Sequence, residues 1–106
     1  MISRIWHGYT SLENAESYEN TLKSEVMAEI AGKEIEGFHE LKLLRRPMGD
    51  EVEFVTIMRF DSLEAIKTFA GEDYEKAFVP AAAQKVLKRF DERVKHYEEQ
   101  YEYGAI

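Results

Sequence analysis

Apolar side chains occupy both faces of the segment 51–60, and this feature constrains the fold more than any other. Successive side chains of an extended strand point to opposite faces of a sheet. The alternation gives two apolar sets, Val52, Phe54 and Met58 on one face and Val55 and Ile57 on the other. A sheet built from such a strand needs cover on both faces, because a large exposed apolar surface is unusual in a monomer.

The first half of the chain predicts a strand, a helix and a hairpin. Residues 2–9, rich in Ile, Trp and Tyr, predict the strand. The helix is predicted to begin with Thr10 and Glu13 as a capping box, to continue with apolar residues at helical spacing, and to stop at Gly32. Segments 37–46 and 51–60 predict a hairpin around a turn at 47–50.

The second half predicts a helical region and a last strand. Residues 61–64 are a second capping box, and the helix that follows is expected to end at Gly71. Pro80 is favoured at a first helical position, so residues 80–87 predict a further helical piece. Residues 92–103 predict the last strand, followed by a polar tail.

The element order of strand, helix, strand, strand, helix, strand is that of the ferredoxin-like fold. We therefore expect the α+β class, with an antiparallel four-stranded sheet in the order 4-1-3-2. No linker or repeat divides the chain, so residues 1–106 are predicted to form a single domain. The helices can cover only one face of this sheet, and the other apolar face favours a homodimer.

Charge and residue usage exclude several functional classes. A net charge of -7 disfavours the phosphate contacts on which nucleic-acid binding depends. The chain has no cysteine, which excludes disulfides, thiolate metal sites and cysteine nucleophiles. No stretch approaches the roughly 20 apolar residues of a membrane span, and no targeting signal is visible. We expect a cytoplasmic protein that binds neither nucleic acid nor membrane.

Four segments occur in order and at compatible spacing over nearly the whole chain: residues 4–8, the hairpin residues 45–46 with 49–54, residues 61–71 and residues 94–98. Together they resemble the antibiotic biosynthesis monooxygenase family. The resemblance implies a dimeric α/β barrel in which two ferredoxin-like sheets pack face to face, each with a pocket between sheet and helices. The family includes cofactor-free oxygenases that act on polycyclic quinols, haem-degrading enzymes and members without an assigned activity, so the fold alone does not decide the chemistry.

The haem-degrading branch of this family uses an Asn on the first strand, a Trp, and a His on the second helical region. Here the first strand has no Asn, the single Trp is Trp6, and residues 62–90 contain no His. This departure argues against haem degradation by that mechanism, and we expect no cofactor.

His96 is the candidate catalytic base. The chain has three histidines, and none has the spacing of a metal-ligand motif, so no metal site is predicted. His96 lies on the predicted last strand, which neighbours the first, and can approach either Trp6 or His7. An imidazole there can take a proton from a phenol or quinol. The alternative is an ordinary hydrogen-bonded residue at a strand edge or dimer seam.

Aromatic and arginine side chains complete the candidate site. Trp6, Tyr74 and Tyr97 are predicted to line an apolar pocket. Arg59, as the second catalytic residue, and Arg4, as a substrate-binding residue, are candidates to stabilise an oxyanion. Each has a structural alternative, since a Trp on a central strand is often core and arginines pair with carboxylates.

The sequence therefore predicts a cofactor-independent, monooxygenase-like protein that binds an aromatic or quinol-type small molecule. The alternative is a non-catalytic small-molecule-binding or accessory module, and a haem-binding or haem-degrading protein ranks third. A pocket of roughly 300 to 1,000 Å3 lined by His, Arg and aromatic side chains would favour the enzyme. A filled interior would favour the module.

Overall fold

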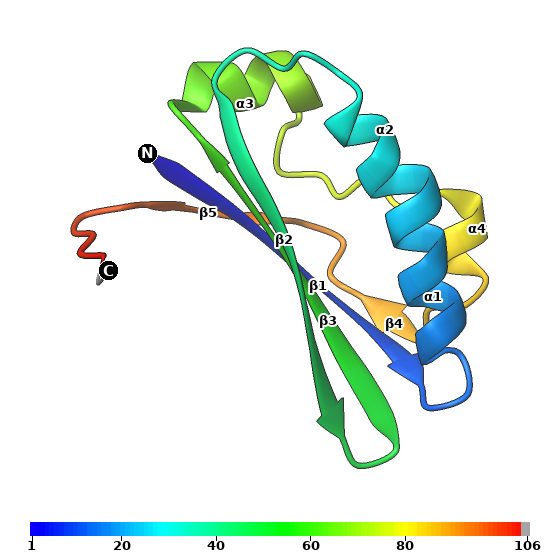
Figure 1. The fold of residues 1–106 in the computed structure, drawn as a ribbon. Coiled ribbons are helices and arrows are strands. Elements are labelled where there is room, and N and C mark those ends of the chain that lie inside the picture. Colours follow the sequence, from blue (N-terminus) through cyan, green and yellow to red (C-terminus); the bar gives the residue numbers. More distant parts are fainter. Residues whose placement is uncertain (105–106) are drawn as a thin grey trace.

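The chain folds as a long, curved antiparallel sheet with its helices packed on one side (Figure 1). The computed structural model describes residues 1–104. Its elements in chain order are β1 (Ile2–Ser11), α1 (Ala15–Thr21), η1 (Leu22–Met27), α2 (Ala28–Ala31), β2 (Phe38–Met48), β3 (Glu51–Phe60), α3 (Leu63–Ala70), α4 (Ala81–Gln84), β4 (Arg89–Phe90) and β5 (Lys95–Glu98). This order confirms the expected ferredoxin-like α+β arrangement.

The sheet is centred on β1 and β3, which pair along their full lengths. Their register runs without a break from Ile2 opposite Phe60 to Ser11 opposite Glu51. The strand order is β2-β3-β1-β4, and β5 also pairs with β1. The order confirms the 4-1-3-2 prediction, because β4 and β5 together occupy the place of the expected fourth strand.

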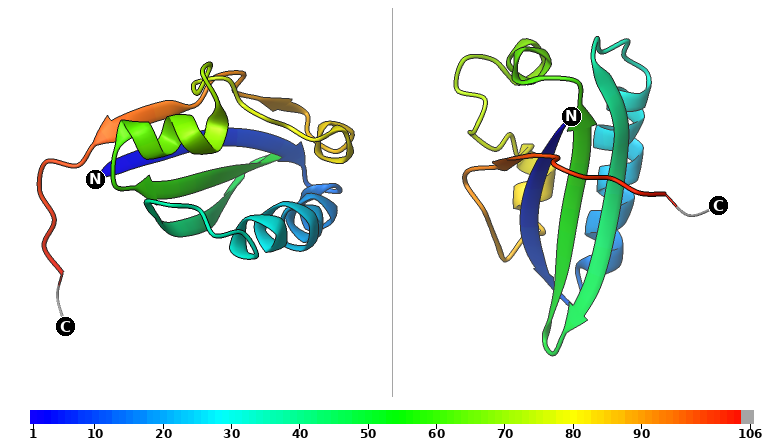
Figure 2. Two further views of the ribbon diagram at one scale, coloured as in Figure 1. Left: turned by 90° about the horizontal axis from the view of Figure 1, so that it is seen from above. Right: turned by 90° about the vertical axis from the view of Figure 1, so that its left-hand side faces the viewer.

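The last strand differs from the continuous strand predicted over 92–103. Two short strands, β4 and β5, pair with β1 in its place, and the residues between them leave the edge of the sheet. There the indole Nε1 of Trp6 donates to the Asp91 carbonyl at 2.7 Å, and the Val94 amide donates to the Glu75 carbonyl at 2.7 Å. These contacts take the place of strand pairing. After β5 the chain leaves the sheet and runs away from the helices (Figure 2).

The first helical region begins later than predicted. Thr10 is fully buried within β1 rather than capping a helix, and Asn14 occupies the N-cap position without a side-chain hydrogen bond. The strand extends because Thr10 pairs with Val52 of β3. The helix then runs through a π-helical segment, η1, and ends at Gly32 as predicted.

The second helical region starts as predicted but is shorter at its end. Ser62 caps α3 by accepting from the Ala65 amide at 3.2 Å, one residue later than the capping box at 61–64 implied. Gly71 ends α3 with a φ of 92°. The helix predicted over 80–87 is limited to α4, because the Lys88 amide donates to the Tyr9 carbonyl at 2.7 Å and leads into β4. None of the helices within residues 1–104 is long and apolar enough to cross a membrane.

The two faces of the sheet differ in cover. On one face, side chains of the sheet and of the helices form two buried clusters, one containing Trp6, Tyr18 and Phe54 and the other Met58, Phe60 and Ile66. The opposite face, which we call the outer face, carries partly exposed apolar residues: Ile5, Leu44, Val55, Ile57 and Tyr97. The register places Ile5 beside Ile57 and Leu44 beside Val55. The two-faced apolar pattern of residues 51–60 is therefore a real feature of the fold.

Candidate functional site

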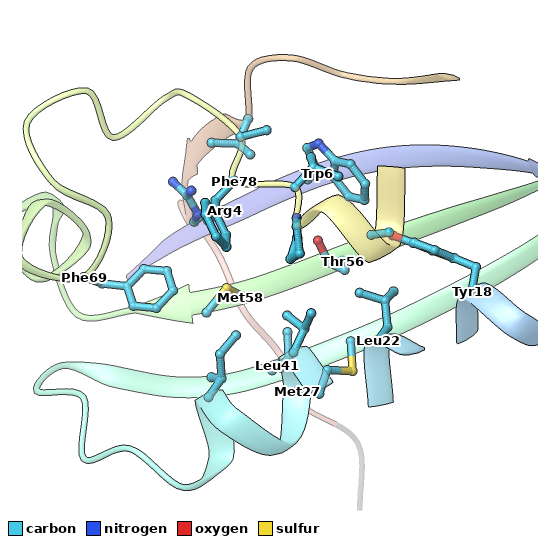
Figure 3. A pocket seen from close by; sticks show the side chains of 17 residues that line it. Arg4, Trp6, Tyr18, Leu22, Met27, Leu41, Thr56, Met58, Phe69 and Phe78 are labelled. Carbon is cyan, nitrogen blue, oxygen red and sulfur yellow. The ribbon is translucent and has the colours of Figure 1, made fainter. Parts of the chain in front are cut away.

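An apolar cavity of about 150 Å3 lies between the inner face of the sheet and the helices (Figure 3). Most of its wall consists of aliphatic, aromatic and Met side chains, and the charged exception is Arg4. Its wall includes Arg4, Trp6, Tyr18, Met27, Met58 and Ala83. Few polar groups on an apolar wall are typical of small-molecule sites, although this cavity is smaller than the roughly 300 Å3 at which drug-sized sites begin.

The π-helix η1 forms one wall of the cavity. Leu22, Val26 and Met27, all from this segment, line it. A π-helix widens the turn by one residue, and short π-helical segments occur frequently at functional sites. No sequence pattern distinguishes this segment, because its apolar residues also fit ordinary helical spacing.

Trp6 is held in a fixed orientation against the cavity. Its side chain is 9% exposed, and its Nε1 donates to the Asp91 carbonyl at 2.7 Å. Gly8, the next residue of β1 on the same face, leaves room for the ring, because a Cβ there would lie 2.6 Å from the Cη2 atom of Trp6. The Trp-x-Gly spacing on one strand face is a sequence signal that could have placed this ring.

Arg4 is a buried cation without a carboxylate partner among residues 1–104. It is 8% exposed, and its Nη1 donates to the Tyr74 carbonyl at 2.5 Å. Burial lowers the pKa of Arg4, but a guanidinium stays protonated in proteins. Each of the other arginines pairs with at least one Asp or Glu, namely Arg45, Arg46, Arg59, Arg89 and Arg93. Arg4 is therefore the exception among the arginines.

His96 lies behind Arg4 and does not line the cavity. Its Nε2 is 2.9 Å from Nη1 of Arg4. Because a guanidinium can only donate, Nε2 is the acceptor and the proton of the neutral ring is on Nδ1. Burial, followed by the charge of Arg4, lowers the pKa of His96, so the ring is neutral near pH 7. Nδ1 is buried and has no partner among residues 1–104.

The structure brings four of the six predicted site residues together. Arg4 and Trp6 line the cavity, His96 contacts Arg4, and Tyr74 supplies the carbonyl that holds Arg4. The Tyr74 ring also meets the His96 ring edge-on, with centroids 5.3 Å apart. Tyr74 itself does not line the cavity, so its predicted role as a lining residue does not fit this position.

Arg59 and Tyr97 lie elsewhere. Both are on the outer face, where each pairs in register with Ser3, and neither lines the cavity. Arg59 makes two hydrogen bonds to the Glu99 carboxylate, at 2.8 and 2.9 Å, and Glu99 raises the pKa of Arg59. The alternative role that the sequence left open for Arg59, an ion pair with carboxylates, fits this placement. The sequence could not fix these positions because the register of the last strand was unknown.

The connection between α3 and α4 supplies cavity residues that the sequence patterns did not predict. Phe78 and Val79 line the cavity, and Phe78 is 87% exposed. An apolar run directly before Pro80, outside any strand or helix, was the available signal. The described residues contain no cluster of three metal-binding side chains. His7 contacts Glu53 and His39 contacts Asp61, both away from the cavity.

Solved structures share this fold, although no family model and no curated protein matches the sequence. A Bacillus cereus protein, provisionally described as an antibiotic biosynthesis monooxygenase, matches with a TM-score of 0.70 and 16% identity, over 99% of this chain and 96% of that chain. The haem degrader MhuD from Mycobacterium tuberculosis, with two haems bound in its active site, matches with a TM-score of 0.65 and 16% identity, over 98% of this chain and 100% of that chain. The chain therefore shares the ferredoxin-like α+β fold of these two structures.

Proposed function

We propose that this chain binds an aromatic or quinol-type small molecule in the cavity between its sheet and its helices. The observation that carries the proposal is an apolar cavity with one immobilised indole, Trp6, and one buried cation, Arg4, on its wall. Convergence of a few polar groups on an apolar pocket is the general pattern of small-molecule sites. An aromatic ligand would pack against the apolar wall, and an oxygen substituent on its ring would accept a hydrogen bond from Arg4.

Cofactor-free oxidation is the chemistry that this site supports best. A cation beside a bound phenol or quinol favours its anion, and that anion can pass an electron to oxygen. A methylene on such a ring would become a carbonyl, with one atom of O2 retained and the other released as water. The reaction balances without an added reductant. Because His96 contacts Arg4 and not the cavity, we assign it a positioning role in place of direct proton transfer.

A haem does not fit the cavity as well as a small ring does. The volume is about 150 Å3, and none of the three histidines, all within the described residues, lines the cavity to supply an axial ligand. The fold shared with MhuD makes haem the natural comparison ligand. Addition of haem should leave its Soret band unshifted, and a stoichiometric shift would reverse this preference.

We further propose that two copies pair through the outer face. Among residues 1–104 no helix covers the apolar residues Ile5, Val55 and Ile57, and a second copy would remove all of them from water. Two-fold pairing of identical faces is the commonest way to build a homo-oligomer. The cavity opens on the opposite face of the sheet, so each copy would keep its own site.

Fluorescence of Trp6 tests the binding proposal directly. Trp6 is the only Trp, so its emission reports on the cavity alone. Aromatic and quinol ligands should change this emission with saturation. Ala83→Leu should weaken binding by filling the cavity, because Ala83 is 1% exposed and lines it. Ala82→Leu is the matched control on the same helix, since Ala82 is exposed and does not line the cavity.

The two variants and an oxygen electrode give distinct outcomes. Equal loss of binding in both alanine variants, or no saturable change with any aromatic ligand, would contradict the proposed site. Binding with ligand-dependent oxygen uptake identifies an oxygenase. Binding without uptake, across single-ring phenol and quinol ligands, identifies the non-catalytic binding module.

A further inference from the structure

We infer that the cavity selects a single-ring aromatic monoanion, such as a benzoate-type carboxylate, whose acid group binds Arg4. The inference deepens the proposed function and rests on it, because it assigns the size and charge of the ligand for the same site. Three observations carry it: the volume of the cavity, the missing counter-charge of Arg4, and the neutrality of His96.

The volume limits the ligand to about one ring. A cavity of about 150 Å3 inside a protein is the size that takes up benzene. A polycyclic quinol exceeds this volume and would project from the open side of the cavity, where Phe78 is 87% exposed. A single ring can lie between Trp6 on β1 and Met27 on η1, which both line the cavity.

The charge of Arg4 sets the sign of the ligand. A buried cation without an anion is costly, and native proteins pair such charges or use them at binding sites. In a chain with 21 acidic residues and a net charge of -7, none of those acids reaches Arg4 within residues 1–104. An anionic ligand would complete the pair. A cationic ligand would leave two like charges at the cavity wall.

The hydrogen bonds of Arg4 leave one side of its guanidinium free. Nη1 is occupied by the Tyr74 carbonyl and His96, whereas Nε and Nη2 have no hydrogen-bond partner among residues 1–104. Nε and Nη2 form the edge of a guanidinium that can bind the two oxygens of a carboxylate in parallel. Tyr74 and His96 therefore act as positioning groups that hold Arg4 for this contact.

His96 limits the ligand to one negative charge. The structure places a neutral imidazole against Arg4, since Nε2 accepts from Nη1. Within residues 1–104, Arg4 is the only charged residue that lines the cavity. One cation balances a monoanion, whereas a phosphate dianion would retain an unbalanced charge in an apolar wall.

Titrations with three matched ligands test the inference on the wild-type protein. Benzoate, benzamide and benzylamine have similar size and shape but are anionic, neutral and cationic near pH 7. Calorimetry should show benzoate binding at least about tenfold more tightly than benzamide, as expected for charge-assisted hydrogen bonds in a buried site. Benzylamine should bind most weakly. Equal affinities for benzoate and benzamide would overturn the inference.

Variants assign the selectivity to Arg4. Arg4→Gln should reduce the preference for benzoate over benzamide to within about threefold, and Arg4→Lys, which keeps the charge, should retain part of it. Arg45→Gln is the control, because Arg45 faces the same helices, pairs with Glu16 and Glu19, and does not line the cavity. A benzoate preference that survives Arg4→Gln in folded protein would overturn the assignment.

The inference and the proposed function fail in different ways. If larger aromatic ligands bind and single-ring acids do not, the inference is wrong while the proposed function stands. If no aromatic ligand changes Trp6 emission, the proposed function itself is wrong. Because the wild-type selectivity needs no variant, a variant that does not fold leaves the main test intact.

Discussion

Nη1 of Arg4 lies 2.9 Å from Nε2 of His96, and β1 and β5 place these two residues directly opposite one another. A guanidinium N–H can donate to an imidazole nitrogen only if that nitrogen carries no proton, so this contact requires a neutral imidazole. The contact therefore ties the protonation of His96 to the charge of Arg4, and it fixes which edge of the guanidinium is occupied.

Stability should fall on mild acidification because of His96. Its pKa in the folded state is lowered from 6.5, first by burial and then by Arg4. The unfolded state therefore binds more protons as the pH drops below about 6.5, and the free energy of unfolding decreases until the pH passes below the folded-state pKa. Urea unfolding from about pH 7.5 to about pH 5.5 should show a smaller decrease in His96→Gln than in wild type. The same decrease in both proteins would contradict the role of His96.

Removal of the neighbouring charge should raise the pKa of His96. In Arg4→Met the Coulombic cause is lost while burial remains, so the pKa should increase without reaching its ordinary value. NMR titration of the imidazole protons measures this change. Arg45→Met is the control, because Arg45 lies beside α1 and should leave His96 unaffected. An unchanged pKa in Arg4→Met would show that the two side chains do not interact in solution.

Tyr18 should tolerate the loss of its hydroxyl. The side chain is fully buried, its ring meets Phe54 edge-on at 4.9 Å, and its hydroxyl has no hydrogen-bond partner among residues 1–104. Burial raises the pKa of Tyr18, which reflects the same desolvation. Tyr18→Phe keeps the ring and removes an unpaired polar group, so the free energy of unfolding should stay the same or rise by about 1 kcal/mol. A loss of more than about 1 kcal/mol in chemical denaturation would mean that the hydroxyl has a partner.

The outer face should control the oligomeric state. Ile57 lies in register with Ile5 at the centre of this face, and a charge there would be buried between two copies. Light scattering should give a dimer for wild type and a monomer for Ile57→Lys. Thr68→Lys, at an exposed position of α3, adds the same charge and should remain a dimer. A wild-type monomer at micromolar concentration would contradict the proposed pairing.

The fold could be predicted from sequence because its determinants are periodic and local. The alternation of Val52 and Phe54 with Val55 fixed two sheet faces, and Gly32 and Gly71 marked two helix ends. Predictions that depended on long-range contacts were wrong in detail. Thr10 looked like a cap, yet its pairing with Val52 keeps it in the strand, a preference that no local pattern reveals.

The site was only partly predictable for the same reason. Trp6 and Arg4 share a strand face by simple alternation, so their meeting at one cavity follows from sequence. The positions of His96 and Tyr97 depend on the register of a four-residue strand, and a shift of one residue exchanges their faces. The π-helix around Val26 has no distinct sequence period.

The methionine methyl groups show whether the ligand occupies this cavity. Met27 and Met58 line the cavity, whereas Met1 and Met48 do not, so the chain supplies two reporters and two controls. In a methyl NMR titration with benzoate, the Met27 and Met58 signals should shift with one common saturation curve while those of Met1 and Met48 stay in place. Saturable shifts confined to Met1 or Met48, or binding that leaves the Met27 and Met58 signals unchanged, would contradict binding in this cavity.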